Sequence, residues 1–571
     1  MQDRNFHIKI FFLTIFLLLV ARLFYLQILN NNYTSLANKN IVCSTKIFPM
    51  RGIIKDRNGE TLVYNEPIFN VSIAPKDVKN LDVKGFCKTF NISEEEFQTE
   101  LKKACKYSYK IPHTFVRNIS FVQFSKIENK IVKFKDIIVE QQFVRRYKHE
   151  ILANVIGYVN KQDKDDKCVF GVTGIEKHYD DILTGKAGVK LDVVDVHGKK
   201  IEKYKNGNYD VKVENGEDIF LTIDAKLQEY GENLIKERIG SIVAIQPETG
   251  EILAMISSPT YNPNDLILDN NFSKKYAQIC FDEERPLLNR AIMCTYPPAS
   301  TFKLVQGMMG LDLNVIDVNT KISCNPTVIK CHYHKNPLNV VDAIANSCNY
   351  FFVNTIQQML KPDAPDRNYF KSTHEKFHLW NEYVHKFFLG SQLGIDLPNE
   401  KSGFVPTQSF YDSLYGKKKW NGSMVRSLSI GQGEVLTTPL QMANIAAIFA
   451  NRGFFITPHL NKKTIVTRYD LDVNKKNLEI IRRGMRKCIT EGNGKNAAVE
   501  GIAVCGKSGT AQNNSSLDHS TFVAFAPMEH PKIAVAVYLE KAGWGAVEAA
   551  MMCSNLLNFY FYEVEKKSKK D

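Results

Sequence analysis

The 571-residue sequence lacks the features that mark several classes of protein. No block of basic residues is interleaved with aromatic side chains, so a nucleic-acid groove is not expected despite a net charge of +13. The twelve cysteines are unevenly spaced in a chain that is far too long for a small disulfide scaffold. No small-residue cleavage site follows the long apolar run near the N-terminus. The positive charge therefore favours attraction to an anionic lipid or polymer, or a solvated surface without a partner.

The length and composition predict a folded protein of roughly two or three domains. The segment Ile10–Leu29 is largely apolar, and its only charged residue is Arg22. Such a segment is long enough to cross a bilayer. It predicts an uncleaved membrane anchor, with a cleaved signal peptide as the alternative. The short N-terminal segment and the large domain behind it predict a cytoplasmic amino end and an extracytoplasmic bulk.

The region after the anchor contains one clear local signal. Residues Arg51–Val63 predict a β-hairpin, because Asn58-Gly59 supplies the positive φ angles that a tight turn requires. The stretch Asp82–Lys167 is rich in lysine and is expected to be irregular, and we find no chemistry in it. A domain boundary is expected near Glu214–Gly216.

The rest of the chain predicts an α+β fold. A helix is expected from Lys226, and the two strands that follow it are joined by a turn, so they form an antiparallel pair. Strands at both ends of this region, with helices between them, predict one antiparallel sheet flanked by helices. The expected strands are Asp218–Ile223, Ser241–Ile245, Ile252–Ile256, Ile502–Cys505, Ser520–Phe525 and Ile533–Leu539.

The strongest chemical signal lies at Pro297–Lys303, directly before the apolar run Leu304–Leu311. Proline is tolerated only before or within the first turn, so a helix is expected to begin at or just before Ser300. Residues three apart share one helix face, which places the Ser300 hydroxyl beside the Lys303 amine. A lysine in a dry pocket can act as the base that activates a serine. A helix-capping serine with a surface lysine is the alternative.

Two further motifs follow in order, Ser347-Cys348-Asn349 and Lys507-Ser508-Gly509-Thr510. Ser-x-x-Lys, Ser-x-Asn and Lys-[Ser/Thr]-Gly together form the set of penicillin-recognising acyl transferases. On these residues the chain resembles the class B penicillin-binding proteins, which are peptidoglycan D,D-transpeptidases. The Arg51-Gly52-x-Ile54-x-Asp56-Arg57-Asn58-Gly59 hairpin is similar to the start of their pedestal. The resemblance implies a penicilloyl-serine transferase (β-lactamase/transpeptidase-like) domain, an elongated β-containing pedestal and an N-terminal membrane anchor.

Further details resemble the elongation (rod-shape) branch of class B more than the division branch. They are Ser429–Gly433 with Thr438–Gln441, His519 before the following strand, and the Trp544 loop. Ala299 departs from the family, where glycine is usual. The resemblance implies a cytoplasmic tail at 1–9, the anchor at 10–29, a pedestal or dimerisation-like domain at 30–215, the transpeptidase domain at 216–565 and a basic tail at 566–571.

The resemblance also implies roles for the motif residues. Ser300, deprotonated by Lys303, would attack the penultimate D-alanine of a D-Ala-D-Ala stem peptide, and Ser347 would relay a proton to the departing D-alanine. Asn349 would hold the substrate amide. The terminal carboxylate would be bound by Lys507, Ser508 and Thr510, with Gly509 in the same strand, and the backbone N–H groups of Ser300 and Thr510 would receive the alkoxide. His519 is expected to be structural.

The same resemblance implies the setting of the reaction. No cofactor is required for the chemistry, the acceptor is an amine of a neighbouring stem peptide, and β-lactams would acylate the enzyme. A D,D-carboxypeptidase side activity is compatible with this mechanism. The expected partners are a membrane glycan polymerase and other elongation-complex proteins, with a single-pass location in a bacterial inner membrane and a periplasmic catalytic domain. A membrane β-lactam sensor and a β-lactamase of the same fold are the alternatives.

A possible metal site overlaps the second motif. Cys324, Cys331 and His334 fall close together in the sequence, and Cys348 lies inside the Ser-Cys-Asn motif. Three sulfurs and one nitrogen suit a closed tetrahedral Zn²⁺ site with a structural role. The spacing does not choose between His334 and His332 as the nitrogen ligand. A Cys324–Cys331 disulfide and unpaired thiols remain the alternatives.

Overall fold

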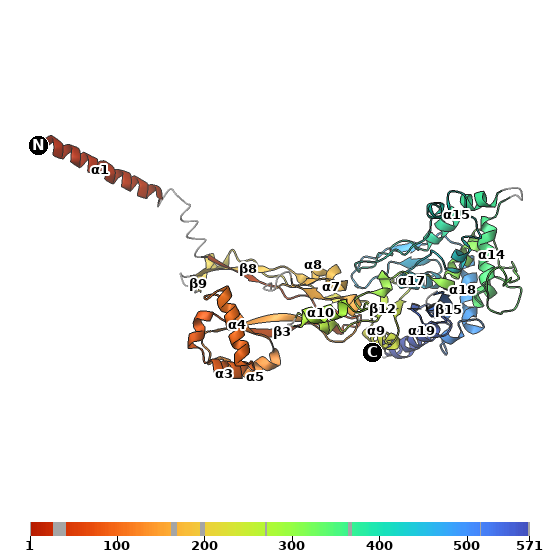
Figure 1. Ribbon diagram of the computed structural model, residues 1–571, viewed down its shortest axis with the longest axis horizontal. Helices are drawn as coiled ribbons and strands as arrows, with labels where there is room; N and C mark the ends of the chain where they lie inside the picture. The colour runs from red at the N-terminus through yellow and green to blue at the C-terminus, as the bar shows by residue number, and fades with distance from the viewer. Residues whose placement is uncertain are drawn as a thin grey trace. The chain divides into compact units, whose positions relative to one another are not determined.

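Figure 1 shows the computed structural model, which describes residues 2–26, 42–161, 168–194, 200–268, 271–363, 368–513 and 516–568. The chain forms two compact units, one of Met1–Gly52 with Thr184–Glu217 and one of Ile53–Leu183 with Asp218–Asp571. The smaller unit contains a three-stranded antiparallel sheet in the order β1 (Val42–Ile47), β8 (Gly188–Val194), β9 (Lys200–Lys203).

The N-terminal helix α1 (Gln2–Phe24) belongs to the smaller unit. Its segment Phe6–Phe24 has a mean hydropathy of 2.1 and is long and apolar enough to cross a membrane. This agrees with the predicted anchor, although the helix begins before the predicted Ile10. The end of the predicted segment, residues 27–29, lies outside the described residues.

The first part of the larger unit is built around one long strand, β3 (Thr61–Ile73), which pairs with three others. Its apolar side chains and three helices form a separate core that includes Val71, Phe86 and Phe97. The prediction of irregular structure over Asp82–Lys167 was wrong for most of this region. It contains α3 (Val83–Phe90), α4 (Glu94–Tyr107), β4 (His113–Ser120), α5 (Phe121–Ile131) and β5 (Ile137–Tyr147).

The predicted hairpin is confirmed, with a correction to its turn. The strand β2 (Ile54–Lys55) pairs antiparallel with β3. Of the two turn residues, only Gly59 has a positive φ angle, of 85°. The loop closes through hydrogen bonds from Asp56 N to Glu60 O and from Gly59 N to Asp56 O. It is therefore a longer loop than the two-residue turn that Asn58-Gly59 suggested.

The second part of the larger unit contains a five-stranded antiparallel sheet, which confirms the predicted antiparallel sheet. Its order is β12 (Ile252–Ser258), β11 (Gly240–Ile245), β17 (Ile533–Leu539), β16 (His519–Ala526) and β15 (Cys505–Ala511). Four of its strands match predicted ones, and β15 begins only at Cys505, so the predicted Ile502–Cys505 strand lies too early. The sixth predicted strand, β10 (Ile219–Phe220), pairs in parallel with β2 instead and belongs to the other sheet.

Helices cover both faces of this sheet. The helices α9 (Ala225–Ile235) and α19 (Glu548–Phe559) pack with Phe522 and Ala524 on one face. The other face, with Val523 and Phe525, packs against the main helical core. Burial on both faces explains why these strands read as continuous apolar runs rather than as alternating ones. Among the described residues no strand pairs with the outer edge of the end strand β15, and the predicted catalytic segment lies against this strand.

Candidate active site

The first motif occupies a tight turn that leads into a buried helix. The 3₁₀ turn η5 (Ala299–Phe302) continues into α12 (Lys303–Asp312), as the two prolines before it predict. Ala299 is buried and has a φ angle of 51°, in the left-handed region where glycine is favoured. This conformation gives a physical reason for a glycine at this position. The Ala299 amide donates to Gly431 O at 2.8 Å, which helps to fix the turn.

Lys303 is fully buried and points at the second motif. Its Nζ lies 2.8 Å from Ser347 O, 3.2 Å from Ser347 Oγ and 2.6 Å from Asn349 Oδ1. Burial, together with the charge of Lys507, holds the pKa of Lys303 well below its usual range. The pKa of Lys507 is also lowered by burial. A lysine in these surroundings is suited to act as a base.

The contacts of Lys303 also fit its neutral form. A neutral amine carries two hydrogens and one lone pair. The two hydrogens match the two groups that can only accept, Ser347 O and Asn349 Oδ1. The lone pair can then accept a hydrogen bond from the Ser347 hydroxyl, which lies 3.2 Å away. The site therefore does not require the ammonium form to satisfy its buried polar groups.

The second motif is a strained turn at the start of α14 (Asn349–Leu360). Ser347 has a φ angle of 56° and is only 8% exposed. Cys348 takes the helix-capping position, where its Sγ accepts a hydrogen bond from Phe351 N at 3.4 Å. Asn349 is held from both sides, because its Nδ2 donates to Lys330 O at 2.8 Å and its Oδ1 accepts from Lys303.

The third motif lies on β15 and packs directly against the first. A Cβ atom added at Gly509 would lie 3.2 Å from Ala299 Cβ, 3.2 Å from Ser300 N and 2.6 Å from Thr521 Cγ2. Only glycine lets this strand approach the serine backbone so closely. Lys507, on the same strand, is fully buried and donates from Nζ to Ser508 O at 2.8 Å. The predicted residues of all three motifs therefore come together.

Two residues without a predicted role also contact the third motif. Gln432 donates from Nε2 to Thr510 O at 3.1 Å, and Gly545 donates its N–H to Thr510 Oγ1 at 3.2 Å. In a strand the N–H and C=O of one residue point to the same side. The Thr510 N–H therefore points, like its carbonyl, to the free edge of β15. Both residues lie in stretches that resembled the family, but no chemistry marked them individually.

The four predicted metal ligands form one cluster. The ligand atoms of Cys324, Cys331, His334 and Cys348 all lie within 4.8 Å of one another. The Cys331 Sγ to His334 Nε2 distance is 3.5 Å, and His334 Nδ1 lies 3.0 Å from Lys335 O. A proton on Nδ1 would donate to that carbonyl and leave the Nε2 lone pair directed at the cluster. This cluster could hold a metal ion.

The thiols of the cluster differ in acidity. A hydrogen bond from Cys348 lowers the pKa of Cys331 to about 4, and the same contact raises the pKa of Cys348. Burial raises the pKa of Cys324. One thiolate is therefore stabilised while the other two thiols stay protonated unless a cation compensates their charge. Cys324 and Cys331 are not joined by a disulfide in this structure.

The two other histidines considered from sequence lie outside the cluster. The ring of His332 lies 5.2 Å from the ring of Trp544, between centroids. His519 accepts a hydrogen bond at Nδ1 from Lys541 N at 3.2 Å, and burial lowers its pKa. This contact ties the end of β16 to the loop after β17, which agrees with a structural role for His519.

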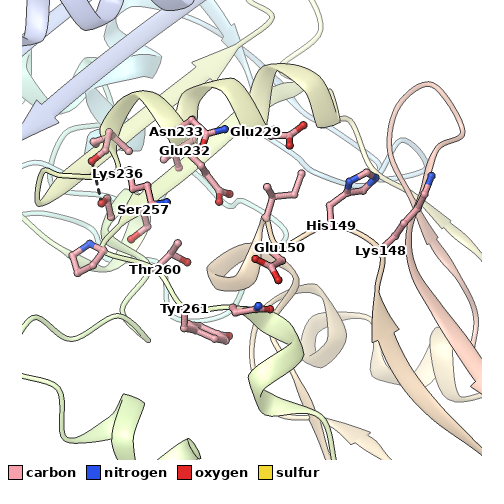
Figure 2. Close-up of a pocket in the computed structure, with 16 residues that line it drawn as sticks. Lys148, His149, Glu150, Glu229, Glu232, Asn233, Lys236, Ser257, Thr260 and Tyr261 are labelled. Carbon is pink, nitrogen blue, oxygen red and sulfur yellow. Dashed lines mark hydrogen bonds between the residues drawn. The ribbon is translucent and has the colours of Figure 1, made fainter. Parts of the chain in front are cut away.

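A separate cavity of about 640 Å³ lies between the pedestal segment at 148–151 and the helix α9 (Figure 2). Figure 2 shows Glu232 projecting from α9 into this space. The hydroxyl of Ser257 is engaged, since it donates to Leu288 O and accepts from Arg290 N. The Thr260 hydroxyl donates to Asn154 Oδ1. None of the three motifs lines this cavity, and it is not the reaction site.

Comparisons with known proteins agree with this geometry. Residues 240–558 match the family model of the penicillin binding protein transpeptidase domain, and residues 46–221 match that of the penicillin-binding protein dimerisation domain. The second match covers the segments built around β3. The first match covers the five-stranded sheet and all three motifs.

Full-length relatives extend this similarity over nearly the whole chain. The peptidoglycan D,D-transpeptidase MrdA of Acinetobacter baumannii is 30% identical over 96% of this chain and 86% of its own length. The MrdA of Escherichia coli is also 30% identical, over 94% of this chain and 90% of its own length. The solved complex of penicillin-binding protein PBP2 with MreC from Helicobacter pylori matches with a TM-score of 0.77 and 25% identity, over 92% of this chain and 100% of that chain.

Proposed function

The chain belongs to the penicillin-binding protein transpeptidase family and is a peptidoglycan D,D-transpeptidase of the elongation type, and we propose that Ser300 is its nucleophile and Lys303 its base. The observation that carries the proposal is the environment of Lys303. This lysine is fully buried three residues after Ser300, and its pKa is well below the usual range. A neutral amine at this place can take the serine proton.

The proposed reaction is acyl transfer in two halves. Ser300 Oγ attacks the carbonyl of the penultimate D-alanine, and its proton passes to Lys303 Nζ. The Ser300 and Thr510 backbone N–H groups stabilise the alkoxide. Each such donor typically contributes about 2.7–4 kcal/mol. The peptide C–N bond then breaks, and Ser347 relays the proton to the departing D-alanine amine.

The second half resolves the acyl-enzyme. An amine of a neighbouring stem peptide attacks the ester carbonyl, gives up a proton through Lys303 and releases Ser300. Asn349 holds the substrate amide, and its own position is fixed by Lys303 and Lys330 O. The terminal carboxylate of the donor is bound by Lys507, Ser508 and Thr510, because cationic and hydroxyl donors form strong hydrogen bonds with carboxylates.

Product analysis tests this proposal. The full-length protein is incubated with polymerised, lipid-linked pentapeptide substrate, and the products are separated by mass. We expect released D-alanine together with cross-linked peptide dimers, and neither product from a Ser300→Ala variant. Released D-alanine without dimers would identify a carboxypeptidase. Hydrolysed penicillin without either product would favour the β-lactamase alternative.

We further propose that Cys324, Cys331, His334 and Cys348 hold a structural Zn²⁺. Zn–S and Zn–N bonds of about 2.3 and 2.0–2.1 Å in a tetrahedron place a sulfur and a nitrogen ligand about 3.5 Å apart. The Cys331 Sγ to His334 Nε2 distance is 3.5 Å. The ion would neutralise the thiolates and fix the loop to Cys348. It would not contact the substrate, because four protein ligands fill its coordination sphere.

Metal analysis with thiol counting tests the zinc proposal. Protein prepared without chelator should contain near-stoichiometric zinc, and all twelve cysteines should react after denaturation and metal removal. A Cys331→Ser variant should lose the zinc, whereas a variant of the exposed Cys280, Cys280→Ser, should keep it. Two missing thiols and no zinc would establish the disulfide. A full thiol count without zinc would leave free thiols.

We propose that α1 anchors the chain in the inner membrane, with the catalytic domain in the periplasm and the domains divided at 30–215 and 216–565. The partners would be a membrane glycan polymerase and other elongation-complex proteins, in line with the MreC complex of the Helicobacter pylori protein. Replacing α1 by an unrelated anchor should preserve penicillin binding but reduce cross-linking of newly polymerised glycan. Unchanged coupling after this exchange and after surface changes in the pedestal would argue against these partners.

A further inference from the structure

The loop that follows α18 (Lys475–Thr490) contacts the segment just before the second motif. Asn493 in this loop donates its backbone N–H to Ala345 O at 3.0 Å and its side-chain Nδ2 to Asn346 O, also at 3.0 Å. A Cβ atom added at Gly492 would lie only 2.1 Å from Ala345 O, so glycine is needed for this close approach. One residue outside the three motifs therefore binds two consecutive carbonyls that precede the second motif.

These two carbonyls lie at the end of the short helix α13 (Val340–Ala345). The last carbonyls of a helix have no partner within the helix and need a donor from elsewhere. The chain turns back at this point, since Ser347 N donates to Ile344 O at 3.2 Å. Asn493 supplies donors to both carbonyls at the start of this turn.

The Asn346 carbonyl acts directly on the strained turn at Ser347. It belongs to the planar peptide group that joins Asn346 to Ser347, so the direction of this carbonyl corresponds to the φ angle of Ser347. That angle is 56°, in the left-handed region, where a residue other than glycine needs support from its surroundings. Ser347 in turn places its carbonyl oxygen and its Oγ 2.8 and 3.2 Å from Lys303 Nζ. A hydrogen bond to Asn346 O therefore helps to set the contacts of the proposed base.

The same loop is held in place relative to the third motif. The helix α18 packs against β15, which carries that motif. Cys488, near the end of α18, is fully buried, and its thiol is contacted by the Ser508 backbone N–H. Gly494, the residue after Asn493, donates its N–H to Cys488 O at 2.9 Å. The donor groups of Asn493 are therefore fixed to an element that also contacts the substrate-binding strand.

We propose that Asn493 is a positioning residue for the acyl-transfer reaction. It holds the peptide group before Ser347 and so places the Ser347 oxygens against Lys303. It does not touch the substrate or the reacting atoms. Without the Nδ2 hydrogen bond, the turn would relax from its left-handed φ angle and carry the Ser347 hydroxyl away from Lys303 Nζ. This proposal rests on the roles proposed above for Ser347 and Lys303.

Acylation kinetics of the full-length protein with a fluorescent penicillin test the proposal. Asn493→Asp keeps the shape of the side chain but replaces the Nδ2 donor by an oxygen. The first-order acylation constant should fall about 10- to 100-fold, because a small displacement of a reacting group is costly. The Kd of the noncovalent complex should stay within about twofold, because the carboxylate-binding residues of the third motif are unchanged. Asn493→Ala introduces no charge and should act in the same direction.

Asn381 provides the matched control. It is half-buried like Asn493, and its Nδ2 donates to Pro406 O at 2.9 Å, a carbonyl outside the three motifs. Asn381→Asp loses a hydrogen bond of the same kind and should leave the acylation constant of the folded protein unchanged. An equal fall in the Asn381 and Asn493 variants would show a general disturbance and overturn the proposal. An unchanged acylation constant in both Asn493→Asp and Asn493→Ala would overturn it as well.

A double-mutant cycle tests whether Asn493 acts through Ser347. If it does, Asn493→Ala should reduce the acylation constant by a clearly smaller factor in a Ser347→Ala background than in the wild-type background. Equal factors in the two backgrounds would refute action through the Ser347 hydroxyl. A Ser347→Ala variant that is acylated as fast as the wild type, or a wild-type protein that is not acylated at Ser300, would instead contradict the proposed function.

Discussion

Replacing Lys303 by methionine removes the proposed base and leaves its hydrogen-bond partners in place. Ser347 O and Asn349 Oδ1 would each lose a donor in a buried site. An unsatisfied buried acceptor typically costs about 1–3 kcal/mol. We therefore expect the free energy of unfolding of Lys303→Met to fall by about 2–6 kcal/mol. Thermal unfolding must accompany every rate measurement on this variant.

Loss of the proposed base should reduce the acylation rate by more than the fall in stability explains. A positioned general base typically contributes about 10²–10⁴-fold to a rate. Acylation of the folded fraction of Lys303→Met by a fluorescent penicillin should fall by about this factor. Lys303→Arg should be equally slow, because arginine does not release its proton and its larger cation must be buried. Near-normal acylation in folded Lys303→Arg would mean that another group is the base.

The pH dependence separates the base from a merely structural lysine. In the proposed mechanism neutral Lys303 is the active form, so the acylation rate should rise with pH through the lowered pKa of Lys303 and then reach a plateau. Lys507→Gln removes a like charge and should shift this rise to higher pH, whatever its effect on the plateau. The exposed variant Lys495→Gln should not shift it. A rise that stays in place in Lys507→Gln would refute the electrostatic argument.

The same pKa shift affects stability. Since the folded protein holds the pKa of Lys303 below its unfolded value of about 10.4, the unfolded chain binds the additional proton between these two values. This group therefore makes the protein more stable as the pH rises through that window. Lys303→Met should lose this pH-dependent contribution.

Three further substitutions test the geometry of the site. Ser300→Ala should abolish covalent labelling by a fluorescent penicillin without lowering the melting temperature; labelling that persists would remove Ser300 as the nucleophile. Gly509→Ala would place a methyl group against Ser300 N and Thr521. The acylation rate should therefore fall about 10²-fold and the free energy of unfolding by about 1–3 kcal/mol. An active variant would show that the strand can move aside. Ala299→Gly should raise the free energy of unfolding by about 0.5–1 kcal/mol, since it relieves a left-handed alanine; a decrease in chemical denaturation would mean that backbone entropy outweighs strain.

The sequence predicted those parts of the molecule where a short residue pattern is compatible with only a few local structures. The two prolines before an apolar run predicted where the helix starts. That start places Ser300 and Lys303 on the same helix face. The strands β11, β12, β16 and β17 were predictable because each is an apolar run between turn residues. Three of the metal-ligand candidates were predictable because cysteine and histidine have few other reasons to gather in one short loop, and Cys348 follows nearby in the second motif.

The pedestal was harder to predict, although some signals were present. Ser93 with Glu96 and Ser120 with Gln123 form capping boxes at the starts of α4 and α5, and these pairs are visible in the sequence. The lysine-rich exposed faces concealed the helices behind them. The pairing of β10 with β2 could not be predicted from the sequence. A strand of two residues is too short to show an alternating apolar pattern, and its partner lies far away in the sequence.

The choice between His332 and His334 shows a limit of spacing arguments. Both residues fall within reach of the same cysteines along the chain. His334 is placed in the cluster by a hydrogen bond between its Nδ1 and the Lys335 carbonyl, and His332 is placed outside it by contact with Trp544. Neither contact has a local signal, since one depends on a carbonyl direction and the other on a loop more than two hundred residues away.

The second motif serves both the proposed metal site and the proposed catalytic lysine through three consecutive residues. Ser347 and Asn349 present their oxygens to Lys303, while Cys348 between them presents its sulfur to the cluster and caps α14. Ser347 holds a left-handed φ angle, which costs free energy and must be compensated by its surroundings. An ion bound to Cys348 would supply that compensation at the centre of the strained turn. In this proposal the ion would fix two partners of Lys303 without taking part in the reaction.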